Sequence, residues 1–167
     1  MDFIFKRVEI KDKNIVLNLF KETAEKINKL NVDHWQYWKN PAQEQINWVM
    51  DGIQNKEFFF IYDLQEEEWF GMVRILKEDL MYWGKQDEKA IYVHSLVVKE
   101  KYNGKGIGIK ILAKIASNAK NDHCKYLRLD ADSKNPKLCS YYEKIGFKKV
   151  GVKALSLSAF NLYEKAL

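Results

Sequence analysis

The stretch YNGKGIGIKIL, Tyr102–Leu112, constrains the fold more than any other part of the sequence. It follows an apolar, β-branched run, IYVHSLVV, at residues 91–98, which predicts a buried strand. A helical pattern of apolar residues begins at Ile111, and a further strand pattern, KYLRLDAD, occupies residues 125–132. A strand, a helix and a strand in this order predict a parallel pair of strands joined by a right-handed crossover.

The rest of the chain predicts a mixed α+β fold, with a mostly antiparallel sheet of about seven strands and four flanking helices. Strands are expected at residues 3–10, 57–64, 68–80, 147–152 and 156–167, and helices at 12–30, from Pro41 to about residue 53, and at 136–145 before Gly146. A chain of 167 residues without repeats or flexible linkers is expected to form one domain, residues 1–167.

Composition excludes several classes of protein. Charged residues make up 31% of the chain, as in ordinary soluble domains, and no apolar run approaches the roughly 20 residues of a membrane span. The net charge is +5, but the lysines are spread along the chain and do not indicate a nucleic-acid partner. The N-terminus lacks the order of a signal peptide. Cys124 and Cys139 lie in no metal-binding pair, which favours reduced thiols, a cytoplasmic location and no metal site.

The glycine stretch has two interpretations from its residues alone. Backbone N–H groups at a helix N-terminus have no partner within the helix, and glycines allow the oxygens of a phosphate to approach them closely. Equally, the glycines could only pack the helix against a strand. A Walker loop is excluded by spacing, and Ile109 stands where a Rossmann fingerprint requires its third glycine.

Two segments resemble motifs of the GCN5-related N-acetyltransferase (GNAT) superfamily. NGKGIG at residues 103–108 is similar to its acetyl-CoA motif, with Asn103 in place of the usual Arg or Gln. NPKLCSYYEKIGF at residues 135–147 is similar to a second signature of the family, with Cys139 in place of a small residue. The predicted order of strands and helices also matches the family over the whole chain.

This resemblance implies that acetyl-CoA binds between the two parallel strands, which splay apart. The backbone of Leu96, Val97 and Val98 would pair with the pantetheine arm, and Asn135 would hydrogen-bond to it. The pyrophosphate would lie on the loop and first helical turn formed by Asn103, Gly104, Lys105, Gly106, Ile107, Gly108 and Ile109. The residues also allow simpler roles: a central strand for 96–98, an exposed helix face for the lysines, and a helix N-cap for Asn135.

The resemblance also implies a general acid and a candidate base. Tyr142 would donate a proton to the CoA thiolate, unless it is only a core aromatic residue. Asp130 and His94, on opposing strands, are rival candidates for the base that receives the proton of the amine. Alternatively, Asp130 pairs with Arg128 or Lys134, His94 is a hydrogen-bonded core residue, and an ordered water takes the proton.

The acceptor side is less constrained by the sequence. In the loop near residue 35, Trp35 and Trp38 offer aromatic faces that suit an amine, although such rings are usually packing residues. The preferred function is acetyl transfer from acetyl-CoA to a small-molecule amine. A protein N-terminus or lysine as acceptor, and a non-catalytic acyl-CoA-binding domain, are the alternatives. The two terminal strands offer an edge that would allow a homodimer.

Overall fold

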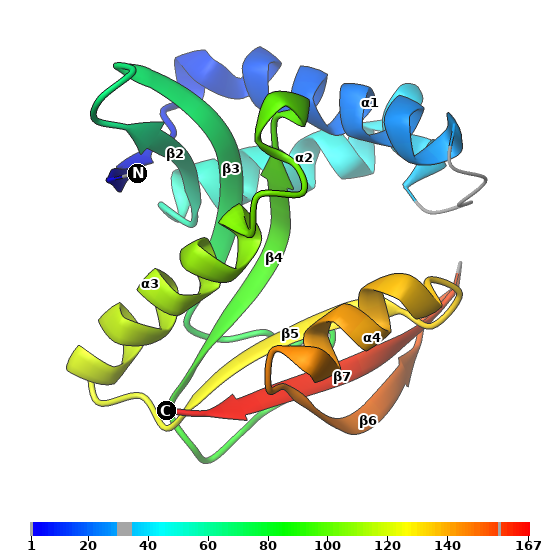
Figure 1. The fold of residues 1–167 in the computed structure, drawn as a ribbon. Coiled ribbons are helices and arrows are strands. Elements are labelled where there is room, and N and C mark those ends of the chain that lie inside the picture. Colours follow the sequence, from blue (N-terminus) through cyan, green and yellow to red (C-terminus); the bar gives the residue numbers. More distant parts are fainter. Residues whose placement is uncertain (1, 30–34, 157) are drawn as a thin grey trace. The chain divides into compact units, whose positions relative to one another are not determined.

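The computed structural model describes residues 2–29, 35–156 and 158–167, and the chain divides into two compact units. The first unit comprises Met1–Arg74 with Ser95–Tyr102, and the second comprises Ile75–His94 with Asn103–Leu167. Strand β4, Ala90–Val98, therefore contributes to both units (Figure 1). Each unit has its own packing.

The first unit packs two helices over antiparallel strands. Strand β1 (Phe3–Arg7) pairs with β2 (Phe58–Asp63), which pairs with β3 (Glu68–Leu76). Helices α1 (Lys13–Lys29) and α2 (Gln43–Gln54) are amphipathic, so each buries one face. Phe20 of α1 and Phe58 of β2 are fully buried in the resulting core.

An ion pair lies beside this core. The Arg74 guanidinium donates to one carboxylate oxygen of Glu57, with N–O distances of 2.6 and 3.0 Å from its two nitrogens. It also lies 4.0 Å from the ring centroid of Trp48. The Arg74 side chain is buried, so its positive charge is stabilised in the folded protein by the Glu57 carboxylate and the Trp48 ring.

The second unit contains the parallel pair of strands. The start of β4 pairs in parallel with β5 (Tyr126–Asp132), from Ala90 opposite Tyr126 to Val93 opposite Leu129. Strand β5 pairs on its other side with β7 (Ala159–Ala166), and β7 pairs with β6 (Lys148–Ala154), both antiparallel. Helix α3 (Ile107–Asn121) connects β4 to β5, and α4 (Pro136–Lys144) follows β5.

The fold class and the element order predicted from the sequence are confirmed. Seven strands form one hydrogen-bonded order, β1-β2-β3-β4-β5-β7-β6, and β4–β5 is a parallel pair. Gly146 follows α4 with a φ of 93°, as expected for the glycine that ends a helix. Leu30, the expected end of the first helix, lies outside the described residues.

Two predicted strands are too long. The first ends at Arg7, and residues Ile10–Asp12 form a 3-10 turn instead. The third ends at Leu76, whereas the apolar pattern predicted a strand to Leu80. Leu80 is exposed, because the chain turns at residues 79–84, where the Trp83 N–H donates to the Asp79 carbonyl. This difference places Asp79 in a loop.

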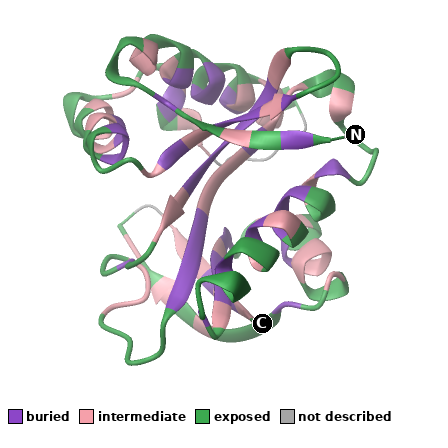
Figure 2. Cartoon of the chain, turned by 90° about the vertical axis from the view of Figure 1, so that its left-hand side faces the viewer, coloured by how far each residue is buried: buried purple, intermediate pink, exposed green. Residues whose placement is uncertain are grey.

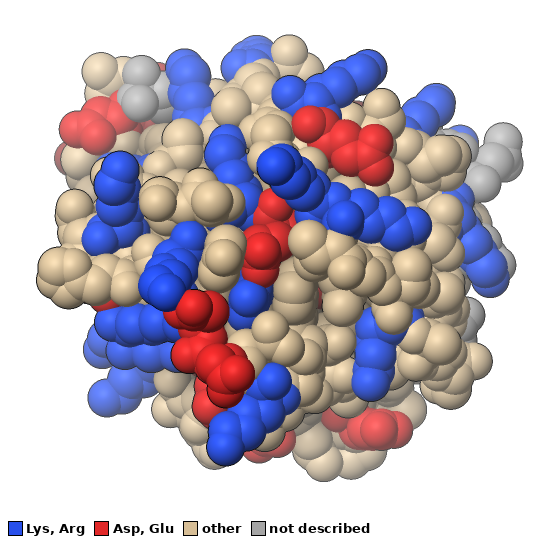
Figure 3. Space-filling model, turned by 90° about the horizontal axis from the view of Figure 1, so that it is seen from below, with Lys and Arg blue, Asp and Glu red and all other residues tan. Residues whose placement is uncertain are grey.

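The surface has the character expected from the composition. In Figure 2 the helices carry both buried and exposed residues, as amphipathic helices do. Figure 3 shows Lys and Arg side chains interspersed with Asp and Glu over the face in view, without one large basic patch. Among the described residues, no helix is both long and apolar enough to span a membrane. Cys124 and Cys139 are buried and form no disulfide.

Candidate active site

The turn before α3 has the backbone conformation that requires glycine. Gly104 and Gly106 have φ angles of 73° and 69°, in the left-handed region, and Gly106 is the N-cap of α3. An added Cβ at either position would meet no atom within 4 Å, so the space beside the turn is open. No side chain caps the first turn of the helix. The turn therefore fits an anion held by backbone N–H groups.

Gly108 has a different role from these two glycines. An added Cβ here would lie 2.9 Å from the hydroxyl oxygen of Tyr141 on α4. A side chain at position 108 would therefore have to displace the Tyr141 hydroxyl, the far end of a flexible side chain. The sequence allowed either a phosphate turn or a packing turn, and different glycines of the stretch suit each purpose.

The end of β4 belongs to the first unit and includes an irregularity. Ser95 has a φ of 53°, a conformation that residues other than glycine seldom adopt within a strand. The pairing of β4 with β5 ends at Val93, before this residue. Leu96, Val97 and Val98 follow, and Val97 packs so closely that a Cβ on Gly71 would lie 2.4 Å from its carbonyl oxygen. Their predicted role toward pantetheine stays a prediction.

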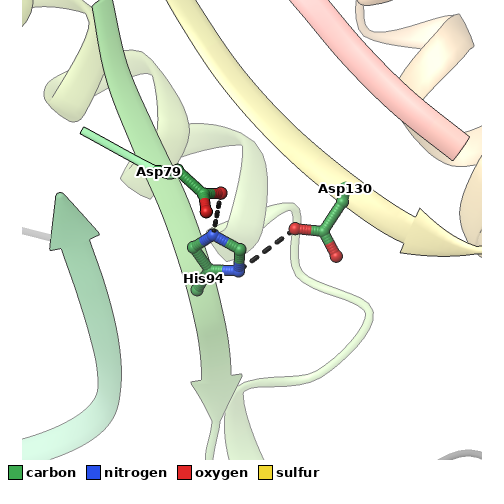
Figure 4. Close-up of side chains that lie close together, drawn as sticks. All are labelled: Asp79, His94 and Asp130. Atoms are coloured by element: carbon green, nitrogen blue, oxygen red, sulfur yellow. Dashed lines mark hydrogen bonds and ion pairs between the residues drawn. The ribbon is translucent and has the colours of Figure 1, made fainter. Parts of the chain in front are cut away.

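In the second unit, the imidazole of His94 lies between two carboxylates (Figure 4). Its Nε2 is 2.7 Å from Oδ2 of Asp79, and its Nδ1 is 3.1 Å from Oδ1 of Asp130. The side chains of His94, Asp79 and Asp130 are only 12%, 5% and 11% exposed. The register of the parallel pair, which sets Val93 opposite Leu129, brings His94 and Asp130 side by side.

The carboxyl group of Asp130 is poorly compensated. Its Oδ1 is buried and has no aligned hydrogen-bond donor among the described residues, although His94 Nδ1 lies at ion-pair distance. Burial raises the pKa of Asp130 to about 6, the nearby His94 partly opposes this rise, and the Asp79 charge adds to it. The alternative pairing with Arg128 is wrong, because Arg128 donates to Glu164 and Tyr92.

Asp79 is the residue of this cluster that sequence reasoning missed. Its Oδ1 accepts the backbone N–H of Tyr82 at 3.1 Å, and its Oδ2 faces His94. The Tyr82 ring in turn lies 5.1 Å from the imidazole, between centroids. One carboxylate oxygen of Asp79 is thus held by the turn at residues 79–84 and the other by His94 of β4. A cavity of about 190 Å³ lies beside this loop, and Asp79 lines it whereas His94 and Asp130 do not.

Tyr142 projects from α4 within the same unit. Its ring lies 5.8 Å from that of Phe147 and 5.9 Å from that of Tyr163, between centroids. Burial raises the pKa of its hydroxyl well above the usual range, and the negative charge of Asp130 raises it further. Tyr142 is therefore a neutral phenol on a half-buried side chain that packs against Phe147 and Tyr163, and the charge of Asp130 adds to the rise in its pKa.

The remaining candidates occupy defined structural positions. The side chain of Asn135 accepts the backbone N–H of Leu138 at 3.1 Å, which confirms its role as N-cap of α4. In the first unit, Trp38 is 4% exposed and stacks on Phe20 at 4.1 Å, and Trp35 meets Phe20 edge-on. Trp38 is thus a core residue. Contacts of Asn135 with CoA, and of either tryptophan with an acceptor, stay predictions.

The cluster can also be considered as a metal site. Within the described part of the chain, Asp79, His94 and Asp130 form a group of three side chains whose potential ligand atoms lie within 4.8 Å of one another. Both imidazole nitrogens already face a carboxylate oxygen, however, so an ion would have to displace one of these contacts. The arrangement suits the sharing of a proton better than the binding of a cation.

Comparison with known proteins decides the family. The sequence model described as "Acetyltransferase (GNAT) family" matches residues 25–147. The chain belongs to the GNAT acetyltransferase family. The resemblance seen in the two sequence motifs is confirmed, and this GNAT protein is an acetyltransferase of a family that uses acetyl-CoA.

Individual relatives of this GNAT acetyltransferase are distant. An uncharacterized N-acetyltransferase of Bacillus subtilis, YesJ, is 25% identical over 159 residues, which cover 87% of this chain and 86% of YesJ. A GNAT acetyltransferase of Listeria monocytogenes has a TM-score of 0.77 at 20% identity, covering 99% of this chain and 95% of the other. A chimera of the Vibrio cholerae spermidine N-acetyltransferase SpeG and hSSAT has a TM-score of 0.67 at 14% identity, covering 99% and 96%. These structural likenesses show a common fold.

Proposed function

We propose that the protein transfers an acetyl group directly from acetyl-CoA to a primary amine of a small molecule, within a ternary complex. The contact between His94 and Asp130 carries this proposal. An amine acceptor must lose a proton during acetyl transfer, and a buried imidazole beside a buried carboxyl group is a proton acceptor suited to neutral pH. We include residues 1–167 as one catalytic domain and a cytoplasmic location in the proposal.

The acetyl donor is proposed to bind through the glycine turn. Its pyrophosphate accepts backbone N–H groups of residues 104–109, with the open left-handed positions of Gly104 and Gly106 allowing close approach. Lys105 lies within this turn, is exposed, and adds positive charge there. Asn103, the backbone of residues 96–98 and Asn135 complete the proposed contacts with acetyl-CoA, following the family motifs.

Tyr142 is proposed as the general acid. When the amine nitrogen bonds to the acetyl carbon, the carbon–sulfur bond breaks and the CoA sulfur takes a proton. A phenol with a raised pKa remains protonated at neutral pH, so Tyr142 can donate that proton and regain one afterwards. Tyr141, its neighbour, packs at Gly108 and serves as the matched control.

A protein N-terminus or a lysine side chain is the alternative acceptor, since one fold can serve several acceptors. The likeness to a spermidine acetyltransferase chimera supports a small polycationic amine only as a first choice for screening. A non-catalytic acyl-CoA-binding domain is the third reading, and it assigns no function to the buried cluster.

A homodimer is also proposed. Strand β6 pairs with β7 on one side, and within the described residues it stands last in the strand order. Val150 and Val152 on this edge are 53% and 56% exposed, which favours coverage by a second copy.

The first test is a thermal-shift series with acetyl-CoA, CoA, NAD and ATP. A ligand at about 100 times its Kd adds about 2.7 kcal/mol to the unfolding free energy, so a shift of several degrees is expected with acetyl-CoA and CoA only. Amines are then screened for release of the free CoA thiol. A response to NAD alone would overturn the proposed donor.

The role of the acid is tested with Tyr142→Phe. We expect kcat to fall about 10²-fold while the thermal shift with acetyl-CoA is retained, because only the proton donor is lost. Tyr141→Phe should keep kcat within a few-fold of the wild type. Full activity of Tyr142→Phe would remove this tyrosine from the mechanism.

A further inference from the structure

The two contacts of His94 are not equivalent. Oδ2 of Asp79 lies 2.7 Å from Nε2, a hydrogen-bonding distance, and an ionised carboxylate can only accept. The other oxygen of Asp79 accepts the Tyr82 N–H, so Asp79 is held in this orientation from both sides. The imidazole therefore carries a proton on Nε2, and its Nδ1 faces Asp130.

The contact on the other side of the ring requires a second proton. A neutral imidazole with its proton on Nε2 leaves Nδ1 unprotonated, 3.1 Å from Oδ1 of Asp130, although the two atoms are not aligned for a hydrogen bond. Two lone pairs at this distance in a buried site repel each other, whereas one proton placed on either atom makes the contact favourable. His94 and Asp130 are then one site that holds one exchangeable proton, rather than rival bases.

The surroundings keep the charge of this site negative. Within the described residues, the groups that face it include the carboxylate of Asp79, the ring of Tyr82 and the phenol of Tyr142. Arg128, the basic residue of β5, donates to Glu164 at 2.7 Å and to Tyr92 at 2.9 Å. With the shared proton the three groups carry a net charge of about −1, and without it about −2, which favours a cationic ligand.

We propose that His94 and Asp130 act as one proton acceptor for the ammonium form of the acceptor amine, and that Asp79 is a positioning residue that holds the ring proton of His94 on Nε2. This inference rests on the proposed function. The ammonium group gives one proton to the shared site, and the neutral amine then attacks the acetyl carbon. As the carbon–sulfur bond breaks, the second proton leaves the nitrogen and the sulfur is protonated, with release of one proton to water overall.

The acceptor expected at this site is an aliphatic primary amine that arrives as an ammonium ion. A net negative charge in a buried site stabilises a cation and disfavours a carboxylate or another anionic group next to the amine. Aliphatic diamines and monoamines should therefore be accepted, and α-amino acids, whose carboxylate lies beside the amine, should be poor acceptors.

The experiment compares wild-type protein with Asp79→Asn, His94→Gln and the double variant. Asp87→Asn, an exposed carboxylate in the same loop, is the control. Nitrogen-15 NMR of labelled histidine reads the tautomer without any need for activity, and the signals missing from His94→Gln assign the ring. We expect Nε2–H in the wild type and a shift toward Nδ1–H in Asp79→Asn, because the new amide can donate to Nε2.

Kinetics then test the coupling between the residues. Asp79→Asn should lower kcat about 10²-fold at pH 7 and leave the thermal shift with acetyl-CoA unchanged. The double variant should be no slower than His94→Gln, because Asp79 acts only through His94. The control should match the wild type within a few-fold.

The possible failures are distinguishable. A wild-type protein that releases thiol with an amine, while Asp79→Asn keeps both the original tautomer and full activity, overturns the inference and leaves the proposed function intact. A double variant whose fold-loss in kcat equals the product of the two single losses also overturns the inference. A wild type that binds acetyl-CoA but releases no thiol with any amine overturns the proposed function, and the proton-acceptor role with it.

Discussion

Replacing Asp130 with Asn should make the stability of the protein less dependent on pH. Burial raises the pKa of the Asp130 carboxyl from 3.8 to about 6. Between these two values the native protein keeps a proton that the unfolded chain has lost. Stability contributed by this group is therefore fully present below pH 3.8 and is lost as the pH rises through about 6.

The size of the effect follows from the shift. A pKa difference of about 2 units corresponds to about 3 kcal/mol, the amount by which ionised Asp130 destabilises the native state at pH 8 relative to the protonated form. About 2 kcal/mol of this loss falls between pH 4.5 and pH 8. Asn is similar in size and does not ionise, so the loss should be absent in Asp130→Asn.

The assay is urea unfolding of the wild type and the variant at several values of pH from 4.5 to 8. The difference between their unfolding free energies should change by about 2 kcal/mol in favour of the variant, while titrations common to both proteins cancel. Asp87→Asn, exposed in the nearby loop, should follow the wild type throughout. A constant difference between wild type and Asp130→Asn would refute the raised pKa, and a change of opposite sign would mean that His94 stabilises the ionised carboxylate more than burial disfavours it.

Other substitutions test the two units separately. Gly106→Ala places a side chain at a φ of 69° in open space, so it should destabilise the protein by about 1–2 kcal/mol and weaken the thermal shift with acetyl-CoA; an unchanged melting temperature would contradict the strain. Glu57→Ala leaves the buried Arg74 charge without its carboxylate and should lower the unfolding free energy by about 3 kcal/mol in urea, whereas a loss below 1 kcal/mol would show that solvent replaces the carboxylate. Trp38→Ala removes the ring stacked on Phe20 and should lower the unfolding free energy by about 3–5 kcal/mol. A stable variant with only a raised KM for the amine would instead indicate that Trp38 contacts the acceptor.

The order of elements was predictable because each depends on local pattern. Strand β4 is a continuous apolar run, α3 repeats its apolar residues at helical spacing, and glycines mark the start of α3 and the end of α4. These sequence patterns involve residues only a few positions apart, so the helices and strands can be predicted from them without knowledge of tertiary contacts. The parallel pairing followed from the strand–helix–strand order alone.

The end of β3 was not predictable from the same pattern. The apolar residues Leu80 and Met81 follow the polar residues 77–79 and are 64% and 60% exposed. What ends the strand is the turn closed by Asp79, whose carboxylate accepts the Tyr82 N–H. The energy of one side-chain cap therefore outweighed the apparent hydrophobic pattern, and a single Asp in such a run gives only a weak signal of this.

The candidate site was partly predictable for a related reason. His94 and Asp130 follow corresponding positions of two strands that the sequence shows to be parallel, so their proximity could be expected once the register was known. The sequence leaves them as rival candidates for the base, because it does not show the 3.1 Å contact between them. Asp79 lies 15 residues before His94, and only the tertiary path of the loop brings it to Nε2. No local sequence pattern predicts a contact of this kind.

The energetics of the cluster indicate why a folded chain would hold such an arrangement. Buried carboxylates that lack full compensation destabilise the native state, and apolar residues of similar volume would pack there more favourably. Asp130 has a buried oxygen without an aligned donor, while the guanidinium of Arg128 on the same strand donates to Glu164 and Tyr92. The folded state thus keeps about 3 kcal/mol of unfavourable energy at neutral pH at a position next to an imidazole. Local instability of this kind is found where a group must exchange a proton with a ligand, because a fully satisfied carboxylate could not accept one.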